Sequence, residues 1–340
     1  MTSREIVLRT IEFRGPERIA MSLPAPYPND LGGGGTTPDP DWKPSRTWKP
    51  RRGAKWEDEW GNVWATLSKH SKGEVMQGAI RDWKDLGTYR LPRFDRASRY
   101  RQAARGFKAR PDKYHLGWLP GFPFAIMRYL RRMDIFLADL LLHPREVRRL
   151  ADRVTALLVR CVNRWADAGA DGVMFCEDWG TQDRLLVSPA LWREVFKPDY
   201  QKIVGAARAR DVAVWMHSCG YIYEIVPDLI EVGIAVLQLD QPGLFGVSRL
   251  AKEFGGRIAF WSPVDIQKVL PSGNRRRIAR NAKNMIERLG GFRGGFVAGY
   301  YGANEAIGVK PEWQDWACRA FVRYGARIRA RGRPTTKRKG

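Results

Sequence analysis

Short apolar runs alternate with longer amphipathic stretches along the last two thirds of the chain. Six such runs, bounded by Gly, Asp or Pro, predict buried β-strands at residues 115–119, 171–176, 212–216, 235–239, 257–261 and 295–298. Between several of them, apolar residues recur with helical spacing and predict helices at residues 144–168, 189–210, 222–231, 247–254 and 275–289. Strand and helix alternation at this spacing is typical of parallel strands joined by crossover helices.

An open doubly wound sheet and an eightfold barrel both fit this alternation, and the polar residues that follow the strands favour the barrel. Five predicted strands in a row are followed by polar or aromatic groups: Cys176-Glu177-Asp178, His217-Ser218-Cys219, Asp240-Gln241, Trp261 to Asp265, and Tyr300-Tyr301. A TIM barrel builds its active site from the loops after several strands. A doubly wound sheet uses one switch point with a glycine fingerprint, and no G-x-G-x-x-G follows any predicted strand. We therefore predict a TIM (β/α)8 barrel, whose closure requires two more strands from the N-terminal third.

The first hundred residues are irregular. Residues 24–50 combine seven prolines with the run Gly32–Gly35, so we expect neither a helix nor a central strand there. The glycine run lacks the Lys-Ser/Thr ending of a phosphate-binding loop, and we interpret it as a flexible surface loop. Residues 56–67 turn to aromatic and β-favouring residues and predict a hairpin. The expected division is an N-terminal elaboration of the barrel (1–110), a barrel core (111–326) and a basic tail (327–340).

Composition predicts a folded, cytoplasmic protein. The 340 residues are 44% hydrophobic and include 14 Trp, which argues against disorder. Four scattered cysteines with no CxxC pair suggest a reducing compartment. The longest apolar stretch, residues 135–142, is short and interrupted by Asp139, so no membrane-spanning segment is expected.

The chain is strongly basic, with 59 Lys+Arg against 36 Asp+Glu and a net charge of +23. Such an excess raises affinity for polyanions and steers acidic small molecules toward the protein. There is no zinc finger, RNA-recognition aromatic motif or clear helix-turn-helix in the sequence. We therefore expect a small-molecule substrate rather than nucleic acid as the main partner.

The candidate chemistry lies after two of the predicted strands. His217 and Cys219 are two residues apart, so imidazole and thiolate can face one ion or one substrate, as in a zinc–thiolate site. The alternative, that both side chains only pack in a loop, stays open. Glu177 and Asp178 are catalytic candidates, because carboxylates after a buried strand are costly unless they have partners. As neighbours in extended chain they point apart, so one could face the mouth of the barrel while the other caps the next helix. Candidates for substrate contact are Gln182, Asp240, Gln241, Tyr300 and Tyr301.

Several segments resemble the uroporphyrinogen decarboxylase superfamily. They are DEWGNVW (58–64), DGVMFCEDWGTQDRLLVSPALWREVFKPDY (171–200), VWMHSCGYIYEIVPDLIEVGIAVLQLDQPG (214–243), FWSPVDIQKVLP (260–271) and GGFVAGYYG (294–302). The resemblance covers residues 58–321 in one order, and it implies a single TIM barrel.

The resemblance implies two possible activities. One branch decarboxylates a tetrapyrrole without metal, using an RQAGRY motif; Arg101-Gln-Ala-Ala-Arg105 imitates this motif without its glycine, and we interpret it as a basic helix surface. The other branch resembles corrinoid-dependent methyltransferases that hold zinc through a His-x-Cys pair and a later Cys. Here the pair is His217 and Cys219, which implies a zinc site, a corrinoid as methyl donor and a corrinoid protein as partner.

The third metal ligand is open at this stage. The loop in which the family's later Cys would fall reads Gly299-Tyr-Tyr-Gly-Ala303 instead. Cys176, Glu177 or Asp178 could face the same mouth, whereas Cys318 is expected to pack in a C-terminal helix. We favour a metal-assisted methyltransferase. The alternatives are uroporphyrinogen III decarboxylase and a noncatalytic barrel that binds a corrinoid or a tetrapyrrole.

Overall fold

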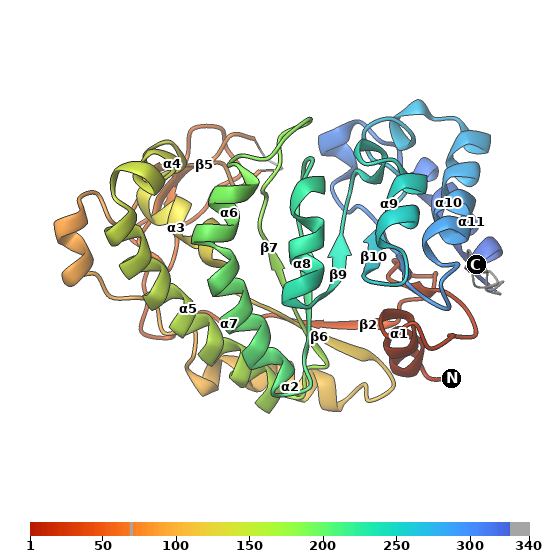
Figure 1. The fold of residues 1–340 in the computed structure, drawn as a ribbon, viewed down its shortest axis with the longest axis horizontal. Helices are drawn as coiled ribbons and strands as arrows, with labels where there is room; N and C mark the ends of the chain where they lie inside the picture. The colour runs from red at the N-terminus through yellow and green to blue at the C-terminus, as the bar shows by residue number, and fades with distance from the viewer. Residues whose placement is uncertain (69–70, 327–340) are drawn as a thin grey trace, which may run out of the picture. The chain divides into compact units, whose positions relative to one another are not determined.

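The computed structural model describes residues 1–68 and 71–326. Eight strands form the barrel sheet, in the order β1-β11-β10-β9-β8-β7-β6-β2, with helices between most of them (Figure 1). The pairings of β1 with β11, β11 with β10, β10 with β9, β8 with β7 and β7 with β6 are parallel. The predicted TIM barrel is thereby confirmed. The predicted tail, residues 327–340, lies outside the described residues.

The chain divides into two compact units, and the candidate site lies in the one formed by residues 32–111 and 115–234. Its strands are β2 (Leu31–Gly34), β3 (Lys55–Glu57), β4 (Val63–Ala65), β5 (Glu74–Gln77), β6 (Tyr114–Trp118), β7 (Gly172–Cys176) and β8 (Ala213–His217). Its α-helices are α2 (Arg101–Lys108), α3 (Pro123–Arg131), α4 (Met133–Leu142), α5 (Pro144–Asp167), α6 (Pro189–Val195), α7 (Lys197–Arg208) and α8 (Val226–Val232). Short 3-10 turns are η1 (Trp83–Gly87), η2 (Ala97–Tyr100) and η3 (Tyr223–Ile225).

The described residues of the second unit are 1–31, 112–114 and 235–326. Its elements are α1 (Ser3–Ile11), β1 (Ala20–Met21), β9 (Ile234–Gln238), η4 (Pro242–Leu244), α9 (Val247–Phe254), β10 (Ala259–Ser262), η5 (Leu270–Ser272), α10 (Arg275–Leu289), β11 (Phe296–Ala298), η6 (Asn304–Ile307) and α11 (Pro311–Gly325). Helices α10 and α11 pack side by side (Figure 1).

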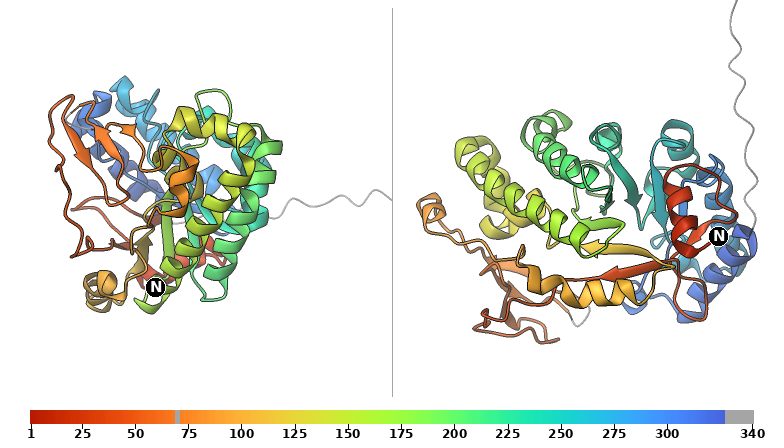
Figure 2. Two further views of the ribbon diagram at one scale, coloured as in Figure 1. Left: turned by 90° about the vertical axis from the view of Figure 1, so that its left-hand side faces the viewer. Right: turned by 90° about the horizontal axis from the view of Figure 1, so that it is seen from below.

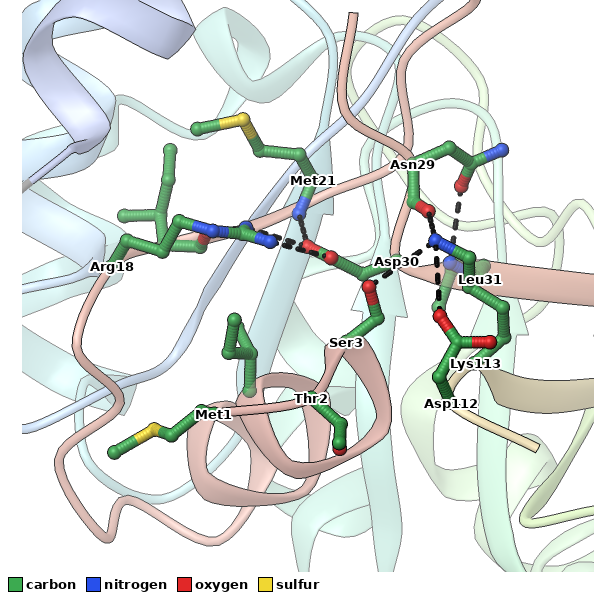
Figure 3. A network of polar contacts seen from close by, with 12 residues as sticks. Met1, Thr2, Ser3, Arg18, Met21, Asn29, Asp30, Leu31, Asp112 and Lys113 are labelled. Carbon is green, nitrogen blue, oxygen red and sulfur yellow. Dashed lines mark hydrogen bonds and ion pairs between the residues drawn. The ribbon is translucent and has the colours of Figure 1, made fainter. Parts of the chain in front are cut away.

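Buried Asp30 organises the N-terminal part of the second unit (Figure 3). Its carboxylate accepts two hydrogen bonds from the Arg18 guanidinium, at 2.7 and 2.8 Å, and one from the Met21 backbone N–H at 2.8 Å. Lys113 donates to Ser3 Oγ and to the Asn29 carbonyl. A buried carboxylate with a charged partner and a backbone donor is satisfied, so the start of β1 is tied to the segment that leads into β2.

All six strands predicted from the apolar runs are present, as β6 to β11, and two strands from the N-terminal third, β1 and β2, complete the sheet. The predicted hairpin is the antiparallel pair β3–β4, which β5 extends to a three-stranded sheet. Figure 2 shows this small sheet in orange, and it contacts helix α3 of its unit. The division at residue 110 stays a prediction.

The interpretation of Gly32–Gly35 as a surface loop is wrong, because Leu31–Gly34 forms strand β2 of the barrel sheet. A Cβ at Gly34 would lie 2.8 Å from the Phe107 ring and 3.0 Å from Ala103 Cβ. The glycine is therefore needed where α2 packs against the strand, rather than for flexibility.

Two helix predictions also need correction. Residues 189–210 form two helices, α6 and α7, since Pro198 cannot donate the backbone hydrogen bond that would continue the first one. Residues 222–231 begin as a 3-10 turn and become α-helical at Val226. Helices α3 and α4 were not predicted; α4 contains the apolar stretch around Asp139. Among the described helices, none has the length and apolar character needed to cross a membrane.

Candidate metal centre

Three side chains with metal-binding atoms lie together at the carboxyl ends of β7 and β8. Asp178, His217 and Cys219 each offer one ligand atom, and these atoms all lie within 4.8 Å of one another. His217 Nε2 is 3.3 Å from Cys219 Sγ and 3.5 Å from Asp178 Oδ1. The His217 side chain is 14% exposed and that of Asp178 is 42% exposed. Solvent therefore reaches the cluster mainly at Asp178, and His217 is mostly buried.

The parallel pairing of β7 with β8 sets this arrangement. Cys176 is in register with His217, and the Glu177 backbone N–H donates to the His217 carbonyl at 2.9 Å. Asp178 and Cys219 follow these two residues by two positions each. The Cys219 backbone N–H donates to Asp178 Oδ1 at 2.8 Å, so one carboxylate both faces the histidine and fixes the cysteine backbone.

The loops after β7 and β8 approach each other so closely that two positions require glycine. A Cβ on Gly220 would lie 2.1 Å from the Gly180 carbonyl oxygen, and a Cβ on Gly180 would lie 2.4 Å from the Tyr221 nitrogen. The loops are joined by hydrogen bonds from Tyr221 N to Thr181 O and from Trp179 N to Ser218 Oγ. These backbone contacts between the two loops therefore bring the ligand atoms of Asp178 and Cys219 together.

Replacing Gly220 by alanine is expected to disturb the cluster. Gly220 has φ +78°, which costs an alanine about 1–3 kcal/mol, and the added Cβ would displace the loop that carries Cys219. We expect at least about tenfold weaker zinc binding, comparable to loss of an outer-shell contact, measured by competition with a chelating dye. Gly169→Ala is the matched control, since Gly169 has φ +86° with no atom within 4 Å of an added Cβ. Equal zinc affinity in the two variants would contradict the proposed role of the close approach.

Glu177 is directed away from the metal cluster into a fully buried polar contact. Its Oε1 accepts the Ala125 backbone N–H at 2.9 Å, near the N-terminus of α3. Its Oε2 accepts from Trp179 Nε1 at 3.1 Å and from the Tyr200 hydroxyl. The two adjacent carboxylates point apart, with Asp178 in the cluster. The prediction that the other would cap the next helix is wrong, because Glu177 accepts from α3, which precedes β7, and Ser188 caps α6.

Burial raises the pKa of Glu177 to about 7, from its usual 4.5. Loss of hydration is the largest cause, and the hydrogen bonds from Tyr200, Ala125 and Trp179 and the charge of Arg128 partly oppose it. A carboxyl with such a pKa can hold or release a proton near neutral pH. Its catalytic role stays a prediction.

The donor set of the cluster fits zinc. Imidazole nitrogen, thiolate sulfur and carboxylate oxygen are the ligands that Zn²⁺ takes in proteins. Tetrahedral bonding at the usual Zn–N, Zn–S and Zn–O lengths separates ligand atoms by about 3.4–3.6 Å. The separations of 3.3 Å and 3.5 Å around His217 Nε2 agree with this. Asp178 thus supplies the third candidate ligand that the sequence left open, from the same unit.

The five residues predicted to contact substrate are distributed over both units. Gln182 is exposed in the loop after β7. In the other unit, Asp240 Oδ1 accepts from Gln238 Nε2, and the Gln241 carbonyl accepts from Leu244 N. Tyr300 accepts from Asn304 Nδ2 through its hydroxyl, and the Tyr301 carbonyl accepts from Gln314 Nε2. Substrate contact by these five residues stays a prediction.

Sequence reasoning missed a cavity of about 300 Å³ beside the cluster. Cys176, the strand neighbour of His217, lines it together with Trp60, Trp118, Tyr129 and Lys72. The DEWGNVW motif contains Trp60 and was the only signal in the sequence that pointed toward this region.

The fold and the site can be set beside known proteins. A methyltransferase from Methanosarcina mazei has a similar structure, with a TM-score of 0.62 and 18% sequence identity over 78% of this chain and 76% of that chain. A D-psicose 3-epimerase from Clostridium cellulolyticum H10, solved with D-tagatose, gives a TM-score of 0.41 and 12% identity over 72% of this chain and 88% of that chain. No curated protein sequence matches the chain.

The sequence model of the uroporphyrinogen decarboxylase (URO-D) family matches residues 68–324, which is well over half of the chain. The match contains β6 to β11 and all three residues of the metal cluster. The chain therefore belongs to the uroporphyrinogen decarboxylase family.

Proposed function

We propose that this protein is a metal-assisted methyltransferase that moves a methyl group between a corrinoid and a thiol or similar acceptor. The observation that carries the proposal is the cluster of Asp178, His217 and Cys219 at the carboxyl ends of adjacent barrel strands. Active sites of TIM barrels lie at this end of the strands. The structural similarity to a methyltransferase supports the fold on which the proposal relies.

Asp178, His217 and Cys219 would hold zinc, which supplies a Lewis acid that lowers the pKa of a ligated thiol to give a thiolate at neutral pH. The residues around the cluster prepare this site. Asp178 fixes the Cys219 backbone through the bond to its N–H, and the Gly180–Gly220 contact holds both loops. Asp178 is the proposed proton acceptor for an incoming thiol, since the Glu177 carboxylate points away from the cluster into a buried contact.

The corrinoid would be carried by a separate protein, and the reaction would take place in the cytoplasm. The decarboxylase alternative lacks support from its motif, because Arg101 and Arg105 are exposed on α2, as expected for a basic helix surface. A noncatalytic barrel would bind a corrinoid or tetrapyrrole without turnover.

An anaerobic methyl-transfer assay tests the proposal. Zinc-loaded protein is mixed with methylcobalamin and a panel of small thiols, and formation of cob(I)alamin is followed by its absorbance. We expect transfer that falls at least about 100-fold in His217→Ala, since a metal ligand is removed. His143→Ala is the control, because His143 is an exposed histidine at the end of α4. Coproporphyrinogen formation from uroporphyrinogen III, without methyl transfer, would instead establish the decarboxylase.

A further inference from the structure

The cavity of about 300 Å³ shares a strand end with the metal cluster. Cys176 is in register with His217, and residues in register on parallel strands project to the same face of the sheet. Trp118 is in register with Met174, which lies two residues before Cys176 and so on that same face. A molecule in the cavity would therefore lie next to the cluster, on the side toward which His217 projects.

Aromatic side chains form much of the cavity wall. Trp60, Trp118 and Tyr129 all line it, and Trp118 is 40% exposed. Tyr129 is supported by Trp64, whose ring centroid is 4.7 Å away, and Trp64 stacks on Trp56 at 5.2 Å. The small sheet is thus anchored to α3 by ring contacts, and flat apolar surfaces of this kind stack on planar rings.

Asp58 shapes the loop that carries Trp60 into the cavity. Its carboxylate accepts from the backbone N–H groups of Trp60 and Asn62, from Asn62 Nδ2 and from Trp64 Nε1. Asn62 Oδ1 in turn accepts the Ala79 backbone N–H, so the Asn62 side chain links the loop between β3 and β4 to the segment after β5. This accounts for the aspartate, tryptophan and asparagine of the DEWGNVW segment.

Lys72 is the charged side chain among the lining residues of this cavity. Its backbone is fixed, since the Trp56 indole N–H donates to the Lys72 carbonyl at 3.0 Å. No carboxylate of the described residues lines the cavity beside it. An ammonium over an apolar, aromatic cavity attracts an anion and disfavours a cation.

We propose that this cavity binds a single-ring aromatic anion, with the ring between Trp60, Trp118 and Tyr129 and the anionic group at Lys72. A volume of about 300 Å³ is at the small end of ligand sites and leaves no room for a tetrapyrrole or corrinoid macrocycle. The bound aromatic anion would then be the small-molecule reactant of the enzyme. This role rests on the proposed function, whereas the binding of the anion does not.

Isothermal titration of metal-free protein with benzoate tests the proposal. We expect benzoate to bind at least about tenfold more tightly than cyclohexanecarboxylate, which lacks the planar ring, and than benzyl alcohol, which lacks the charge. Trp118→Leu and Lys72→Met are each expected to weaken benzoate about tenfold. The matched controls are Trp48→Leu, at a tryptophan 45% exposed, and Lys84→Met, at an exposed lysine; neither residue lines the cavity.

The outcomes separate this proposal from the proposed function. Absence of benzoate binding, equal weakening in the control variants, or tighter binding of benzyltrimethylammonium than of benzoate would each overturn the aromatic-anion site. Unchanged benzoate affinity in His217→Ala supports a binding site that does not need the metal. Loss of methyl transfer with intact benzoate binding would count against the proposed function alone, and transfer without benzoate binding would count against this site alone.

Discussion

Protein reconstituted with zinc is expected to hold about one zinc ion per chain, and His217→Ala and Cys219→Ser are each expected to lose it. Removing one of three protein ligands leaves two, and we expect affinity to fall by at least about 100-fold. The measurement is metal content by plasma mass spectrometry on tag-free protein, with affinity from chelator competition. Circular dichroism on the same samples shows whether each variant is folded.

Asp178→Asn distinguishes the two roles of the aspartate, as a charged metal ligand and as a hydrogen-bond acceptor for the Cys219 backbone. Its Oδ1 faces His217 Nε2 at 3.5 Å and accepts the Cys219 N–H at 2.8 Å. An asparagine oxygen can still accept from Cys219 but lacks the negative charge, so we expect a smaller loss of zinc than in Cys219→Ser. Asp183→Asn is the control, because Asp183 is an exposed carboxylate in the same loop. Zinc retained at wild-type affinity in all three cluster variants would rule out this site.

The strand pattern and the strand-end residues could be predicted because both depend on local sequence. Each buried strand is a short apolar run, and polar residues directly after it must lie at the rim of the sheet, so His217, Cys219 and Asp178 were all identified. Which of the two adjacent carboxylates, Glu177 or Asp178, joins His217 and Cys219 in the candidate cluster could not be predicted in this way. The partners of Glu177 are Ala125, Tyr200 and Trp179, two of which come from distant parts of the sequence.

The cavity and strand β2 could not be predicted for a related reason. Trp60 comes from the loop between β3 and β4, Trp118 from the end of β6, and Tyr129 from α3, so tertiary packing alone brings them together. Gly32–Gly34 has no side chain that could give a strand pattern. It forms a strand because barrel pairing and the close packing of Phe107 against Gly34 outweigh the low strand propensity of glycine.

Glu177→Ala is expected to destabilise the folded protein by about 3 kcal/mol or more. The change leaves the Ala125 N–H, the Trp179 indole N–H and the Tyr200 hydroxyl without the carboxylate and opens a space in a fully buried site. Glu177→Gln keeps the size of the side chain and one acceptor oxygen, so we expect a smaller loss. Urea unfolding in excess chelator measures both variants without a contribution from bound metal.

The effect of Glu177→Gln should depend on pH in a stated direction. The pKa of Glu177 is about 7 in the folded protein and near 4.5 when unfolded, so the folded state binds the proton more tightly. Its contribution to stability is therefore full below pH 4.5 and is lost as pH rises through 7, a total of about 3 kcal/mol. Glutamine does not titrate, so the stability gap between wild type and Glu177→Gln should shrink by about 2 kcal/mol from pH 5.5 to pH 8.

Glu194→Gln provides the comparison for this pH dependence, because Glu194 is an exposed glutamate on α6 of the same unit. Its gap to wild type should stay constant between the two pH values, since this variant leaves the buried Glu177 carboxyl and its hydrogen bonds unchanged. A constant gap for Glu177→Gln as well would mean that the buried carboxyl is ionised throughout, with its hydrogen bonds outweighing the cost of burial. In that case Glu177 could not serve as a proton donor near neutral pH, and Asp178 would be the carboxylate left for acid–base chemistry at the cluster.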